Sequence, residues 1–180
     1  MRSRKWPLGL ALLVILGVVA LMGAGGSPDE EYAVYSAYLS SESGVELGDT
    51  VLIAREMYLE DTILNNRWVA LAGCWSRLAW RPNPPPSSLV CQLFVSNLWP
   101  HGLESRFQLR SPYEVHDETV LNELPVAYHS LSNIGFNRDK TMALFYAEFR
   151  CGLCGWGGFV LMKKSGGKWV VANHYGTWIS

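Results

Sequence analysis

The stretch SLSNIGFNRDKTMALFYAEFRCGLCGWGGFVLMKKSGGKWVVANHYGTWI, residues 130–179, decides the fold. Its residues fall into four strand-like runs, at 130–136, 141–149, 158–164 and 168–179. Short polar or glycine-rich segments separate these runs, as they separate the strands of antiparallel meanders. The C-terminal third therefore predicts an antiparallel β-meander of about four strands.

The second run is apolar at every position of its central part. Its two alternating sets of side chains are Met142, Leu144 and Tyr146 on one face, and Ala143, Phe145 and Ala147 on the other. A strand with two apolar faces is typical of the middle of a covered sheet. We therefore expect this strand to be central, with helices from the N-terminal part of the chain over one face.

Three segments ahead of the meander have the pattern of helices, at 28–39, 89–98 and 117–124. The first begins with a capping box, in which Ser27 caps the helix and Glu30 follows three residues later. A short apolar run at 50–54 predicts one more strand. Residues 55–80 fit both helix and strand patterns and stay unassigned, and the stretch that contains Phe107 and Tyr113 is expected to be irregular. The fold class predicted is α+β, with helices packed on the meander.

The N-terminus has the layout of an export signal or a membrane anchor. Arg2, Arg4 and Lys5 precede an uncharged apolar run at 8–26, and acidic residues follow at 29–31. As a helix, the run would be about 28 Å long, close to the thickness of the hydrocarbon layer of about 30 Å. The basic flank predicts that the N-terminus stays in the cytoplasm, and that the rest of the chain lies on the other side of the membrane.

This layout predicts two parts, a signal peptide or transmembrane anchor at 1–26 and a single extracytoplasmic domain at 27–180. A retained helix would make the protein a single-pass protein of the cell membrane, with the membrane as its partner. A cleaved helix would make it periplasmic or secreted. The helix cap at Ser27 lies immediately after the apolar run, and a free N-terminal ammonium there would oppose the helix dipole. This small effect favours the retained anchor.

The composition argues against nucleic acid as a partner. The chain has 15 basic and 16 acidic residues, and no long run of one charge sign lies outside the N-terminal flank. It also lacks a nucleophile elbow, a Walker-type loop, a dinucleotide-binding glycine pattern and a metal-ligand spacing. The sequence therefore predicts neither a cofactor nor a metal.

Four cysteines follow the export signal, which favours disulfides. The spacing allows Cys74 to pair with Cys91 around a proline-rich loop, and Cys151 to pair with Cys154 across a tight turn. Cys151 and Cys154 also form a CxxC motif, the pattern of a thiol-disulfide oxidoreductase. Glycines and a strand follow the motif in place of a helix, so a structural disulfide is the preferred interpretation.

The weak catalytic candidates are Glu148 and His174. Both lie on predicted strands, where they could face one concave side of the sheet as general acid and base. The four histidines, His101, His116, His129 and His174, are scattered without a metal-binding pattern.

The C-terminal residues also carry a resemblance. The pattern runs through Gly135-Phe136-Asn137, Asp139, Thr141, Ala143-Leu144 and Tyr146, then Cys151-Gly152-Leu153-Cys154-Gly155, Gly157-Gly158 and Gly167-Lys168-Trp169. It resembles the C-terminal part of uncharacterised exported bacterial proteins. The meander that ends in Gly-Lys-Trp is also similar to nuclear-transport-factor-2-like and cystatin-like domains, which implies helices on a curved sheet and no particular site residue.

Three functions follow as hypotheses. The first is a non-catalytic exported or membrane-anchored domain that binds an unidentified protein or small molecule. The alternatives are an enzyme with a pocket that uses Glu148 and His174, and a thiol-disulfide oxidoreductase at Cys151 and Cys154.

Overall fold

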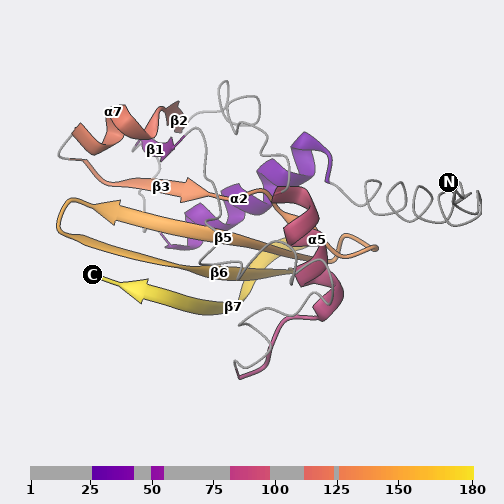
Figure 1. The fold of residues 1–180 in the computed structure, drawn as a ribbon. Helices are drawn as coiled ribbons and strands as arrows, with labels where there is room; N and C mark the ends of the chain where they lie inside the picture. The colour runs from indigo at the N-terminus through magenta and orange to yellow at the C-terminus, as the bar shows by residue number, and fades with distance from the viewer. Residues whose placement is uncertain (1–25, 43–49, 55–81, 98–111, 124–125) are drawn as a thin grey trace, which may run out of the picture.

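A mixed sheet with helices on both faces forms the centre of the part of the chain that the computed structural model describes (Figure 1). That part comprises residues 26–42, 50–54, 82–97, 112–123 and 126–180. The N-terminal segment 1–25, the unassigned segment 55–80 and Cys74 lie outside the described residues. Among the helices that are described, none is long and apolar enough to cross a membrane.

Seven strands make up the described sheet. Six of them follow the order β2 (Tyr113–His116), β1 (Val51–Ala54), β3 (Tyr128–Leu131), β5 (Met142–Cys151), β6 (Cys154–Ser165) and β7 (Lys168–Ile179), and the seventh, β4 (Gly135–Phe136), pairs with β5. Strand β1 runs parallel to both β2 and β3, while all other pairs are antiparallel. The fold is therefore a mixed α/β arrangement, in which the predicted meander is one half of a larger sheet.

The meander is confirmed at its centre and corrected at its start. β5, β6 and β7 cover the last three predicted runs. The first predicted run is split into β3 and β4, because the chain leaves the ladder at Ser132 and Asn133. The Ser132 hydroxyl accepts a hydrogen bond from the Tyr146 N–H at 2.8 Å, and Asn133 Nδ2 donates to the Ser96 carbonyl at 2.8 Å.

The expectation of an irregular segment around Tyr113 is wrong at 113–116, where strand β2 pairs with β1 in parallel. Its partner, Val51–Ala54, lies some 60 positions earlier in the chain. A local sequence pattern therefore does not predict the pairing.

All three predicted helices are present: α2 (Pro28–Glu42), α5 (Ser87–Asn97) and α7 (Glu118–Glu123). The Ser27 hydroxyl accepts the Glu30 N–H at 3.3 Å, which confirms the predicted cap. Helix α2 runs three residues beyond its expected end at Leu39, and so brings Glu42 to the sheet. Its buried residues Val34, Tyr35, Tyr38 and Leu39 follow helical spacing along one side.

The two faces of β5 carry separate cores. Ala143, Phe145 and Ala147 pack under α2, whereas Leu144 and Tyr146 pack under α5. Figure 1 shows α2 and α5 with the long strands between them. The prediction that β5 is central is therefore confirmed, and helices cover both of its faces.

Helix α5 packs directly against the backbone of Gly135 in β4. A Cβ at this position would lie 2.6 Å from Leu93 Cα and 2.8 Å from the Gln92 carbonyl carbon, so that α5 would have to move. We expect Gly135→Ala to lower the free energy of unfolding by about 1–3 kcal/mol, the usual effect of overpacking. Chemical denaturation measures this loss.

Gly176→Ala is the matched control, because nothing lies within 4 Å of a Cβ built there. Equal stability of the two variants would contradict close packing of α5 on β4.

Candidate functional site

A cavity of about 330 Å³ opens on the α2 face of the sheet. We call it the His129 cavity. Its lining residues come from the end of α2, from β1 and its preceding residue, from the start of β3, and from β5 and β6: Glu42, Thr50, Val51, Leu52, Ala127, His129, Phe149 and Trp156. Among the described lining residues, Glu42 is the one acidic side chain, and no Lys or Arg is present. The walls are otherwise largely apolar and aromatic, which is typical of sites for small organic molecules.

His129 lies in the middle of the sheet, because β3 places it in register with Ile53 of β1 and Phe149 of β5. The residue is only 5% exposed, and its buried Nδ1 has no hydrogen-bond partner in the part of the chain that the structure describes. Burial lowers the pKa of His129 from 6.5 to about 4, so the imidazole is neutral at neutral pH. Its ring contacts those of Phe149 and Tyr38, at centroid distances of 5.0 and 6.4 Å.

Tyr38 joins the two histidines of this face. Its ring lies 6.4 Å from that of His129 and 6.3 Å from that of His174, and the side chain is fully buried. Its hydroxyl has no hydrogen-bond partner among the residues that the structure describes. Burial, and after it the negative charge of Glu42, raises the pKa of Tyr38 far above its usual value. The hydroxyl therefore stays protonated at any physiological pH.

Glu42 and His174 meet at the rim of the His129 cavity. Their side chains approach at 3.1 Å between Oε1 and Nε2, and both are about one-third exposed. A second cavity, of about 200 Å³, lies beside them and shares Glu42 and Trp156 with the first. The ring of Trp156 contacts that of His174 at 6.1 Å. Trp156 and Glu42 thus line both cavities.

The structure does not bring Glu148 and His174 together, which corrects the expectation that they share one face. Alternation along β5 puts Glu148 on the same side as Tyr146, under α5. His174 contacts Tyr38 and so lies on the α2 side, while its neighbour Tyr175 lies in the α5-side core. The general acid–base pair predicted from these two residues therefore has no geometric basis.

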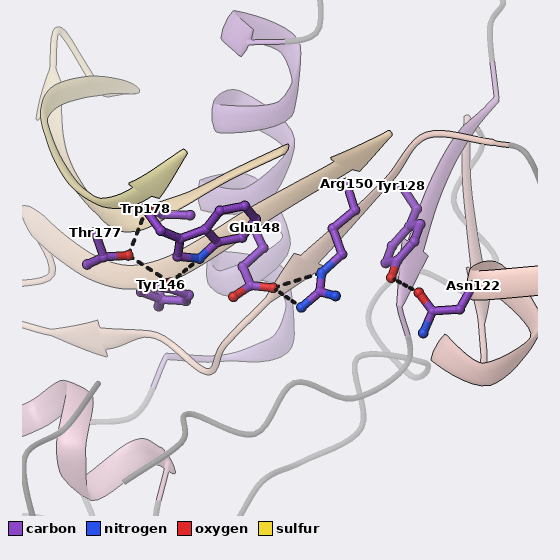
Figure 2. A network of polar contacts seen from close by, with 8 residues as sticks. Asn122, Tyr128, Tyr146, Glu148, Arg150, Thr177 and Trp178 are labelled. Atoms are coloured by element: carbon purple, nitrogen blue, oxygen red, sulfur yellow. Dashed lines mark hydrogen bonds and ion pairs between the residues drawn. The ribbon is translucent and has the colours of Figure 1, made fainter. Parts of the chain in front are cut away.

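Glu148 belongs instead to a polar row on the α5 face, shown in Figure 2. Arg150 donates to Glu148 Oε2 from Nε at 3.1 Å and from Nη2 at 2.9 Å. On one side of this pair, the Tyr128 hydroxyl donates to Asn122 at 2.6 Å; on the other, Trp178 Nε1 donates to the Tyr146 hydroxyl at 3.1 Å. A cavity of about 300 Å³ borders the row at Arg150 and Trp178. Arg150, the one cationic side chain among its described lining residues, is already paired with Glu148, so the row fits a structural role.

Cys151 and Cys154 form a disulfide across the turn between β5 and β6, with 5.0 Å between their Cα atoms. The two cysteines face each other in the strand register, and only Gly152 and Leu153 lie between them. No helix begins at Cys151, so no helix dipole favours a thiolate there. This geometry suits a structural disulfide. The oxidoreductase hypothesis stays a prediction, and rapid alkylation of Cys151 after mild reduction would be needed to support it.

Cys91 of α5 is also disulfide-bonded. Its predicted partner, Cys74, lies outside the described residues, so that pairing stays a prediction.

Sequence reasoning named His129 only as one of four scattered histidines and did not single out Glu42, Tyr38, Phe149 or Trp156. A signal for His129 is its position in the run Tyr128–Leu131, where every residue is buried. The described residues contain no group of three or more His, Cys, Asp or Glu side chains placed to hold a metal ion.

In comparisons with known protein families, curated proteins and solved structures, nothing matches this chain. The resemblances stated above therefore rest on their quoted residues alone.

Proposed function

We propose that this protein is a non-catalytic, exported or membrane-anchored domain that binds a small organic molecule in the His129 cavity. The observation that carries the proposal is His129 itself, a buried imidazole at the wall of a cavity, whose Nδ1 has no hydrogen-bond partner among the described residues. Buried polar groups without partners are rare in folded proteins and destabilise them. Nδ1 stays buried, but a bound molecule would fill the cavity and offer a hydrogen-bond partner to the other ring nitrogen, Nε2.

The surroundings favour binding over catalysis. The neutral imidazole of His129 contacts aromatic rings, and no carboxylate of the described residues is hydrogen-bonded to it, as would be expected for a residue that exchanges a proton with a substrate. Glu42 and His174 lie close together, but both side chains are partly exposed to solvent. These features support a site that holds a ligand without changing it.

The proposed location rests on the N-terminal sequence and on the cysteines. The basic flank and the apolar run at 8–26 support export, and the disulfides suit an oxidising compartment. Mass spectrometry of the N-terminus, on protein purified separately from membrane and soluble fractions, would distinguish a retained anchor from a cleaved signal. An intact N-terminus found only in the cytosol would contradict both forms of the proposal.

Binding can be tested with small aromatic probes, because the natural ligand is not known. We expect toluene, indole and acetophenone to perturb the NMR signals of residues 50–52, 127–129, 149 and 156 in a saturable way. Ala127→Phe should weaken this binding at least tenfold, because position 127 lines the cavity yet is exposed enough to accept a ring without disturbing the core.

The matched control is Ala172→Phe, at an exposed position of β7 that does not line the cavity. It should leave binding unchanged. Failure of every probe to perturb these signals at millimolar concentration would overturn the proposed function.

A further inference from the structure

We infer that the occupant of the His129 cavity is a neutral aromatic compound that carries a hydrogen-bond-accepting oxygen, such as an aryl ketone or aldehyde. This inference rests on the proposed function and specifies the ligand of the same site. Three features of the cavity lead to it: its aromatic walls, the orientation of the His129 ring and the charge of Glu42.

The aromatic walls determine the body of the ligand. Phe149 and the His129 imidazole lie 5.0 Å apart by ring centroid and 45° apart in plane, and Trp156 lines the same cavity. Flat rings gain from edge and offset contacts with such walls, in addition to the area that they bury. A volume of about 330 Å³ suits a molecule of one or two rings.

The His129 ring determines the polar group. Because Nδ1 is fully buried, only the opposite edge of the ring, which carries Nε2, can reach a molecule in the cavity. A neutral imidazole has a single N–H. A buried N–H without a partner is rarer in proteins than a buried acceptor without one. The proton therefore belongs on Nε2, from which it can be donated to an oxygen of the ligand.

Glu42 determines the charge of the ligand. Its carboxylate lines the cavity, and no Lys or Arg does so among the described residues. Its Oε1 lies 3.1 Å from Nε2 of His174, which lines the second cavity. A carboxylate ligand would meet this negative charge in a partly desolvated site, where repulsion is stronger than in water. The site thus favours a neutral carbonyl over an acid of the same shape.

Three probes of nearly equal shape test the inference: acetophenone, ethylbenzene and benzoate. We expect acetophenone to bind about tenfold more tightly than ethylbenzene, the effect of one hydrogen bond. Benzoate should bind at least tenfold more weakly than acetophenone. Equal affinity for acetophenone and ethylbenzene would overturn the inference but leave the proposed function standing, whereas no binding by any of the three would contradict the proposed function itself.

The tautomer of His129 gives a second, ligand-free measurement. Long-range ¹H–¹⁵N spectra distinguish a protonated ring nitrogen from a bare one, and we expect the proton of His129 on Nε2. A proton on Nδ1 would overturn the inference.

In His129→Phe, the preference for acetophenone over ethylbenzene should fall to less than about twofold, while ethylbenzene still binds. Persistence of the full preference in this variant would mean that another group binds the oxygen. The comparison of probes on the unaltered protein decides the question even where this variant does not fold.

Discussion

Replacement of Phe145 by alanine is expected to lower the free energy of unfolding by about 3–5 kcal/mol, the usual range for a buried phenylalanine. Phe145 is fully buried in the centre of β5. Its ring makes edge-to-face contacts with Tyr35 and Tyr38 of α2, at centroid distances of 5.4 and 5.2 Å. The variant removes the ring that joins helix and sheet and leaves a cavity between them.

The midpoint of urea denaturation, with the slope of the transition held fixed, measures this loss. Val170→Ala on β7 is the control, because Val170 is 44% exposed and its truncation should change stability by less than about 0.5 kcal/mol. A loss below about 1 kcal/mol for Phe145→Ala would mean that α2 does not pack on the sheet as described. Because Tyr38 also contacts His129, the same variant should weaken probe binding at the His129 cavity.

The central strand could be predicted from the sequence because its information is local. Six consecutive apolar positions allow one interpretation, a strand covered on both faces. The glycine turn at 165–167 and the two-residue turn at Gly152 and Leu153 likewise define the hairpins. Strand pairs joined by short turns leave a signal in neighbouring residues.

The rest of the sheet depends on residues that are distant in sequence. The parallel pairs of β1 with β2 and β3 join segments whose separation exceeds any local pattern. The break at Ser132 and Asn133 arises because their side chains bond to Tyr146 and α5, contacts that a run of strand-forming residues does not reveal.

The candidate site depends even more on contacts between residues that are distant in sequence. Strand alternation would place Glu148 and His174 on opposite faces, but only if the register of β7 on β6 is known. That register shifts twice, between Gly157 and Gly158 and between Leu161 and Met162. Each shift exchanges the faces on which later residues lie, so face assignments along β7 cannot be counted from the sequence alone. Glu42 reached the site only because α2 is longer than its pattern predicted.

Acid should destabilise this domain through His129, by about 3 kcal/mol between pH 7 and a pH below 4. In the unfolded chain, the imidazole takes up its proton near pH 6.5; in the folded protein, burial lowers the pKa of His129 to about 4. Between these two values, the unfolded state binds more protons than the folded state. The free energy of unfolding therefore falls as the pH falls through this window, and is fully retained above it.

The groups that face His129 do not compensate for this loss. Tyr38 and Phe149 contact its ring without bearing a charge, and Glu42 is the one acidic or basic side chain among the described residues that line the His129 cavity with it. Glu30 also contributes stability that acid removes, but its pKa is lowered by the hydrogen bond with Lys164, so its effect comes at a lower pH than the start of the His129 window.

His129→Phe isolates the effect, since it keeps an aromatic ring at the position and removes the titrating group. Urea denaturation at pH 7, 5.5 and 4 should show a smaller loss of stability in this variant than in the unaltered protein, with the difference largest at the lowest pH. All other residues are the same in both proteins, so their contributions cancel from the comparison. Parallel pH profiles for the two proteins would show that the folded state admits a protonated imidazole at position 129, and a site that admits this charge would not be the dry, neutral cavity on which the ligand assignment depends.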